Sequence, residues 1–371
     1  MKLLDRERLL ENIEKIAAYD FSEHKVFGSA YWVCAQDLVV EKCYGVQGLD
    51  SARPVTASTV FRLASMTKPI TAVATLILVE RGLLSLDDPV DRYLPAFKSV
   101  KIIDVQGASA RPEKIPTVRQ ILTHTSGIGG LKEKIARLSQ SDKTTLDASI
   151  AFFLKNGLDF EPGSMQMYSG FGAFDVLTKI IEKITGTDYL SFLQREIFTP
   201  CEMWDTTFTP SEEQRGRMIE MHDRVNGANA TFAMPKGCIF ESIPQTHYLG
   251  GAGLVSTLHD YANFASMLLN RGQTPTTGRI LKESTFFELC TPQISKGDFE
   301  CWGLGVRVVA GEGKPYLPKG CFGWSGAYGS HFWIDPENKI AAVFMKNSKC
   351  DGGAANESAR KFEEAVYSSF A

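Results

Sequence analysis

Strand patterns at both ends of the chain, with helical patterns between them, most constrain how this sequence can fold. Residues 26–34 and 38–44 have strand-like patterns and are joined by a short turn at residues 35–37, which predicts a hairpin. Strand patterns return only late in the chain, at residues 303–309, 331–334 and 340–345. This order predicts an α/β (α+β) fold whose antiparallel sheet is built from both chain ends and flanked by helices.

Helical patterns account for much of the remaining chain. Residues 5–18 and 357–370 are amphipathic, and an apolar helical run over residues 68–81 stops at Gly82. Further helical patterns occupy residues 118–123, 146–154, 173–184 and 189–198. We therefore predict a single unit over residues 1–371, with an α/β lobe from residues 1–80 and about 250–371. A mostly helical lobe, about 81–249, is inserted between them, and we expect a cleft at the junction.

Charge and composition exclude several classes of protein. Forty basic and forty-three acidic residues give a net charge of −3, which provides no electrostatic footprint for nucleic acid or an anionic membrane. The N-terminus lacks a secretory apolar region, and the longest apolar stretch, residues 70–79, is too short to span a bilayer. We therefore expect a cytoplasmic protein without nucleic-acid or membrane partners. The oligomeric state does not follow from the sequence.

Cysteine and histidine spacing gives no sign of a metal or a disulfide framework. The eight cysteines include no C-x-x-C pair, so we expect reduced thiols. The six histidines lie far apart, and no H-E-x-x-H motif occurs. No phosphate-binding loop is present either, because the glycines of residues 250–253 are not followed by Lys-Ser/Thr. We expect neither a metal nor another cofactor.

The sharpest chemical signal is Ser65-Met66-Thr67-Lys68. Residues three apart at a helix start lie on one face, so the two functional side chains can meet. Serine becomes a nucleophile when a neighbouring base takes its proton, and a buried lysine can do so. The backbone N–H of Ser65 would also face a developing oxyanion at the helix start. The same tetrapeptide fits an ordinary N-cap serine followed by a solvated lysine, so the wider context decides.

That context resembles the serine β-lactamase-related family, which includes class C β-lactamases, penicillin-binding DD-peptidases and related esterases. Further segments match the family in order from about residue 28 to 346. They are Gly82 to Val90, the L-x-H-x-S-G run at residues 122–127, Glu161-Pro162-Gly163 with Tyr168-Ser169, Ile197 to Thr206, and Gly250 to Tyr261. The resemblance implies a β-lactamase/transpeptidase-like fold.

The resemblance also assigns roles to residues. It implies that Ser65 is the catalytic nucleophile and that Lys68 and Tyr168 transfer protons. Which of these two is the base stays open, because a coupled pair titrates as a unit. The triplet Trp324-Ser325-Gly326 corresponds to the family's Lys-Thr-Gly, which implies substrate contacts there. The N–H of Ala327 would then join that of Ser65 as an oxyanion donor.

Two departures from the family pattern narrow the function. Its Tyr-x-Asn is here Tyr168-Ser169-Gly170, so Gly170 lines the substrate site without the amide. Trp324 replaces the strand lysine and removes a cation that would attract a substrate carboxylate. Both changes resemble the β-lactamase-like carboxylesterases and acyltransferases.

We therefore expect a serine hydrolase that works through an acyl-enzyme on small ester, amide or β-lactam-like substrates and is carboxylesterase-like. A DD-peptidase, a weak β-lactamase and an acyltransferase are alternatives of the same class. A catalytically silent binding or scaffold protein is the alternative of a different class.

Overall fold

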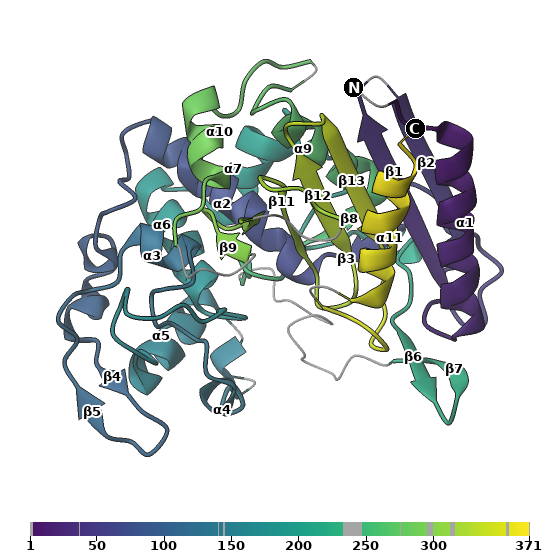
Figure 1. Ribbon diagram of the computed structural model, residues 1–371. Coiled ribbons are helices and arrows are strands. Elements are labelled where there is room, and N and C mark those ends of the chain that lie inside the picture. The colour runs from purple at the N-terminus through teal and green to yellow at the C-terminus, as the bar shows by residue number, and fades with distance from the viewer. Residues whose placement is uncertain are drawn as a thin grey trace.

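The largest element of the structure, a computed structural model, is a seven-stranded antiparallel sheet (Figure 1). The structure describes residues 3–36, 38–139, 141–143, 145–232, 247–274, 276–294, 300–311, 316–353 and 356–370. The strand order is β2-β1-β13-β12-β11-β10-β9. The strands are β1 (Gly28–Ala35), β2 (Leu38–Gly45), β9 (Glu300–Trp302), β10 (Arg307–Val309), β11 (Phe322–Ser325), β12 (His331–Asp335) and β13 (Ile340–Met345).

The first strand in the chain, β1, lies next to the last, β13. Strand β1 pairs with β13 in a register that sets Tyr31 opposite Phe344, and it also forms the expected hairpin with β2. Asp37, in the predicted turn of that hairpin, lies outside the described residues. An antiparallel sheet built from both chain ends is therefore confirmed.

One strand prediction was wrong. Residues 303–309 do not form a continuous strand, because a turn at residues 303–306 separates β9 from β10. In that turn the N–H of Gly303 donates to the carbonyl of Val306 at 2.9 Å. Gly305 has a φ of +75°, a conformation that glycine adopts without a steric penalty. The side chains of the turn are buried, so the apolar pattern of the sequence continues through it. The pattern therefore gives no sign that the chain reverses direction there.

Helices cover both faces of the sheet. On one face α1 (Arg6–Ser22) contacts α11 (Glu357–Ser368), and a buried apolar cluster joins them to alternate residues of the central strands. Within it the ring of Phe362 lies 5.2 Å from those of both Tyr31 and Trp333. On the other face α9 (Leu258–Leu269) packs against β1, β12 and β13. Alternate residues of the strands therefore pack into two separate hydrophobic cores, one on each face of the sheet.

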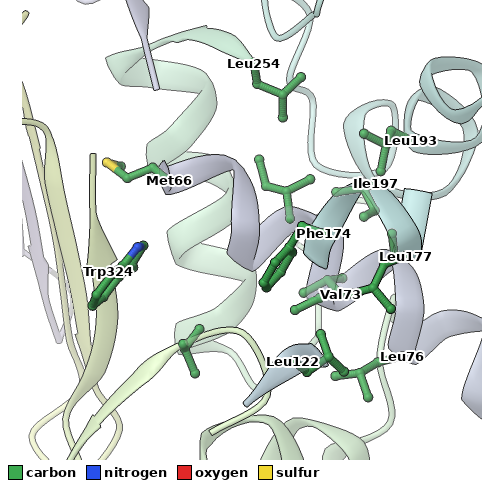
Figure 2. Close-up of a cluster of buried hydrophobic side chains, with 14 of the residues drawn as sticks. Met66, Val73, Leu76, Leu122, Phe174, Leu177, Leu193, Ile197, Leu254 and Trp324 are labelled. Carbon is green, nitrogen blue, oxygen red and sulfur yellow. The ribbon is translucent and has the colours of Figure 1, made fainter. Parts of the chain in front are cut away.

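The second core extends into the helical part of the chain, where α2 (Thr67–Glu80) is buried along almost its whole length. Figure 2 shows Val73 and Leu76 packed among Phe174, Leu177 and Leu122. The other helices are α3 (Val118–Leu122), α4 (Lys132–Ile135), α5 (Leu146–Asn156), α6 (Ala173–Thr185), α7 (Tyr189–Leu193), α8 (Glu212–Gly216) and α10 (Glu283–Cys290). Because α2 contacts α6, the segment that begins with Ser65 is anchored in this core.

In the part of the chain that the structure describes, three small two-stranded sheets accompany the large one. They are β3 (Val60–Arg62) with β8 (Val255–Thr257), β4 (Ile102–Ile103) with β5 (Ser109–Ala110), and β6 (His222–Val225) with β7 (Ala228–Thr231). The first of them joins the chain just before Ser65 to the chain just after residue 250. The division into lobes at about residues 80 and 250 stays a prediction. In the described ranges, no helix is long and apolar enough to cross a membrane.

Candidate active site

Ser65 lies in a short 3-10 turn, Ala64–Met66, between β3 and α2. The sequence placed it in the first turn of the helix, but the α-helix begins two residues later, at Thr67. Ala64 has a φ of +46°, in a region that costs an L-residue about 1 kcal/mol. The neighbouring backbone compensates, since the N–H of Leu63 donates to the carbonyl of Leu254 at 3.0 Å. The serine is thus presented by a tightly held, strained turn.

The structure brings Ser65, Lys68 and Tyr168 together. The Tyr168 hydroxyl donates to Ser65 Oγ at 2.7 Å, and Lys68 Nζ lies 3.5 Å from the same oxygen. Tyr168 comes from an irregular segment about 100 residues further along the chain, just before α6. A hydroxyl with a phenol and an amine within reach is the arrangement of an activated nucleophile and its proton-transfer partners.

Lys68 is completely buried and is held by neutral groups. Its Nζ donates to the carbonyl of Gly251 at 2.8 Å and to that of Gly170 at 3.3 Å. The rings of Tyr168 and Phe174 lie 4.9 and 5.3 Å from the same nitrogen. Within the described ranges no carboxylate forms an ion pair with Lys68. Backbone carbonyls therefore hold the lysine in this chain, which lacks the Asn of the family's Tyr-x-Asn motif.

The glycines of this site leave room that side chains would occupy. A Cβ on Gly251 would lie 3.2 Å from Lys68 Nζ, close enough to crowd the amine. A Cβ on Gly170 would meet no atom within 4 Å, so the space beside Tyr168 is open there. Gly170, which the sequence assigned to the substrate site, thus contributes a carbonyl to Lys68 and borders open space.

Strand β11 carries the third part of the site. The indole N–H of Trp324 donates to the Tyr168 hydroxyl oxygen at 3.3 Å. A Cβ on Gly326 would lie 2.5 Å from the carbonyl oxygen of Leu63, so only glycine lets β11 approach the turn before Ser65 this closely. Ala327 follows directly and is exposed. Among the described residues, the N–H groups of Ser65 and Ala327 have no hydrogen-bond acceptor.

The Ser325 side chain points away from Trp324, as alternation along a strand requires. Its Oγ lies 2.8 Å from His331 Nδ1, and His331 Nε2 lies 3.0 Å from a carboxylate oxygen of Glu363 on α11. All three side chains are buried. A substrate contact through this hydroxyl stays a prediction, and in the structure the hydroxyl binds His331.

Sequence reasoning missed Trp302, on the edge strand β9. Its ring stacks on that of Tyr168 at 5.8 Å and lies 4.5 Å from that of Trp324. No motif surrounds Trp302. Its position depends on sheet pairing, in which Arg307 lies between Trp302 on one side and Gly323 on the other.

Lys346, a cation that could take the place of the missing strand lysine, is completely buried and forms an ion pair with Asp351. It therefore has no exposed charge to offer a substrate. Within the described part of the chain, no cluster of three or more His, Cys, Asp or Glu residues could hold a metal ion.

Comparisons with known proteins identify the family to which the chain is similar. Residues 9–365 match the family described as Beta-lactamase. Esterase EstB from Burkholderia gladioli is 28% identical over 382 residues, covering 94% of this chain and 93% of that protein. Penicillin-binding protein 4* from Bacillus subtilis (strain 168) is 32% identical, covering 89% of this chain and 70% of that protein.

A solved structure supports the fold independently. It is described as EstCE1, a hydrolase with promiscuous acyltransferase activity, and it superposes with a TM-score of 0.83 at 23% identity. The alignment covers 98% of this chain and 99% of that one. The β-lactamase/transpeptidase-like fold implied by the sequence motifs is therefore confirmed.

Proposed function

The chain belongs to the Beta-lactamase family, and we propose that it is a carboxylesterase-like serine hydrolase that forms an acyl-enzyme on Ser65. One observation carries the proposal. The Ser65 hydroxyl oxygen accepts a 2.7 Å hydrogen bond from Tyr168 and lies 3.5 Å from the amine of the buried Lys68. The similarity to Esterase EstB over nearly the whole chain supports the same assignment.

In the acylation step, Ser65 Oγ attacks the ester carbonyl while its proton passes to the Lys68–Tyr168 pair. The N–H groups of Ser65 and Ala327, which have no acceptor among the described residues, bind the oxyanion that develops on the carbonyl oxygen. Tyr168 returns the proton to the departing alcohol, since its hydroxyl is hydrogen-bonded to the attacking oxygen. The acyl group then remains bonded to Ser65.

In the deacylation step, water attacks the acyl carbonyl and gives its proton to the same pair. The acid leaves, and Ser65 recovers its hydrogen. An alcohol in place of water would transfer the acyl group instead, so one site supports both hydrolase and acyltransferase outcomes.

The surroundings of the serine favour an uncharged ester over a β-lactam. Trp324 and Trp302 form a nearly buried aromatic wall beside Tyr168. Lys346 cannot supply the missing cation, because it is buried and paired with Asp351. A substrate carboxylate therefore has no counter-charge from either position. The open space beside Gly170 leaves room for an acyl or alcohol group.

An active-site probe and three substrates test this function. We expect a fluorophosphonate probe to label the native protein once, and Ser65→Ala to abolish the label while Ser51→Ala keeps it. We expect p-nitrophenyl esters to be hydrolysed well above nitrocefin and D-Ala-D-Ala peptides. Equal turnover of nitrocefin would identify a β-lactamase. Product partition with an added alcohol would reveal acyl transfer, and a folded protein that takes no label would be a silent member of the family.

A further inference from the structure

We propose that His124 is a positioning residue that holds the Tyr168 hydroxyl toward Ser65 by binding the backbone on both sides of the tyrosine. This inference rests on the proposed function, in which Tyr168 transfers protons. It assigns His124 no contact with substrate. The residue acts through Tyr168 alone.

Tyr168 depends on contacts from other segments for its position, since the local tie in its own segment is a side-chain bond from Ser169 to the carbonyl of Phe171 at 2.7 Å. Residues 165–169 form neither helix nor strand, so no regular hydrogen-bond ladder fixes the backbone there. A phenol that must stay 2.7 Å from Ser65 Oγ requires that its Cα be held in place.

His124 supplies two bonds that bracket Tyr168. The N–H of Met167 donates to the carbonyl of His124 at 2.9 Å, and the N–H of Ser169 donates to its Nδ1 at 3.1 Å. The imidazole also lies against the tyrosine, with ring centroids 4.7 Å apart. One residue therefore contacts the backbone before the tyrosine, the ring itself and the backbone after it.

The imidazole must be neutral to accept the Ser169 N–H, and its environment keeps it so. Burial holds the pKa of His124 well below 6.5, and the nearby Lys68 charge lowers that pKa further. An unprotonated Nδ1 places the hydrogen on Nε2. That nitrogen is buried and has no hydrogen-bond partner among the described residues. The ring therefore acts as an acceptor at Nδ1 and does not carry protons to Ser65.

The backbone of His124 explains which substitutions make informative tests. Its φ is +57°, in the left-handed region where Asn is the best tolerated residue after Gly. Asn also presents a carbonyl oxygen on a short side chain, which can accept the Ser169 N–H. His124→Asn therefore keeps the acceptor and suits the backbone, whereas His124→Phe keeps a ring without an acceptor.

The first experiment measures kcat and KM for a p-nitrophenyl ester in both variants. We expect His124→Phe to lower kcat roughly 10- to 100-fold, the scale of small misplacements of reacting groups, with KM little changed. We expect His124→Asn to recover most of the lost kcat. Retention of full kcat by His124→Phe would overturn the inference. So would an Asn variant as slow as the Phe variant.

A second experiment needs neither turnover nor a stable variant. In ¹⁵N-histidine-labelled native protein, we expect His124 to show an unprotonated Nδ1 that accepts a hydrogen bond and a protonated Nε2. A protonated Nδ1 could not accept the Ser169 N–H and would overturn the inference directly. This result is separate from the proposed function, which fails instead if the native ester hydrolysis survives Ser65→Ala.

Discussion

Two lysines of this chain, Lys68 and Lys346, are both completely buried, yet their surroundings differ in kind. The amine of Lys68 meets two backbone carbonyls and the Ser65 hydroxyl, with no carboxylate in ion-pair range among the described residues. The amine of Lys346 meets the carboxylate of Asp351 and, at 3.1 Å, the hydroxyl of Ser358.

The surroundings of Lys346 include further charged groups, which we call the ionic cluster. Ser358 also donates to Asp20 at 2.8 Å, and burial raises the pKa of that aspartate while the charge of Lys346 opposes the rise. Lys25 adds a second cation, 3.9 Å from Asp351 and 2.5 Å from Glu357. These residues join α1, the loop after β13 and α11.

The contrast indicates that the two buried lysines have different roles. A carboxylate partner stabilises the charged form of a lysine, so a paired lysine is a poor proton acceptor and a good structural tie. Backbone carbonyls hold the amine of Lys68 in place without a counter-ion. The role proposed for Lys68 is in catalysis, and Lys346 links the chain ends through its ion pair with Asp351.

The largest expected effect is on catalysis at Lys68. We expect Lys68→Ala and Tyr168→Phe each to lower kcat by about 10²–10⁴, the usual scale for general acid–base groups. The double variant should be little worse than the poorer single one, because the two act as a unit. Ester hydrolysis assays on the three proteins check this. Full activity in either single variant would remove that residue from the mechanism.

The converse experiment replaces Lys346, and its expected effect is on the stability of the protein. We expect Lys346→Met to reduce the free energy of unfolding by about 3 kcal/mol, because the buried Asp20 loses its strongest opposing charge and Asp351 keeps, among the described residues, only Lys25, 3.9 Å away. Lys68→Met strands no carboxylate and leaves only neutral carbonyls without their donor, so it should reduce the free energy of unfolding by less than Lys346→Met does. Urea unfolding measures both. The partly exposed Lys349 provides a control, since Lys349→Met should change stability by less than about 0.5 kcal/mol. Equal destabilisation by the two buried substitutions would erase the contrast.

A smaller effect is expected from giving the site a substrate-facing cation. Trp324→Lys should shift the ratio of kcat/KM values toward carboxylate-bearing substrates by about 10- to 100-fold, the equivalent of a charge-assisted contact of roughly 1.5–3 kcal/mol. Trp324→Phe is the matched control, because it keeps an aromatic ring, adds no charge and loses the N–H that donates to Tyr168, so it should slow all substrates alike. A ratio unchanged in the lysine variant would show that Trp324 does not set this preference.

The smallest expected effect is on how the stability contributed by Glu357 depends on pH. The hydrogen bond from Lys25 is the main cause that lowers the pKa of Glu357 from 4.5 to about 2. A lowered folded-state pKa means that the stabilisation is present above pH 4.5 and is lost as the pH falls toward 2. We therefore expect Glu357→Gln to lower Tm at pH 7 and to lower it less at pH 3. A difference in Tm that stays constant between these pH values would contradict the assignment.

Local patterns in the sequence determined much of this protein. Alternation and helical periodicity predicted the terminal hairpin, the strands near both chain ends and the helix after Ser65, because these patterns depend on residues close together. Spacing of three residues placed Ser65 beside Lys68 for the same reason. Tyr168 lies far from both in the chain, and only the order of family motifs pointed to it.

The tertiary structure alone decided what surrounds those groups. The carbonyls that hold Lys68 and the stacking of Trp302 on Tyr168 join segments distant in sequence, and the contact of Ser325 with His331 depends on the pairing of β11 with β12. No periodicity encodes such contacts, because they depend on which strands pair and on how closely glycines let backbones approach. The same holds for the two buried lysines. The sequence shows each as one more Lys, and the fold determines that one meets carbonyls and the other a carboxylate.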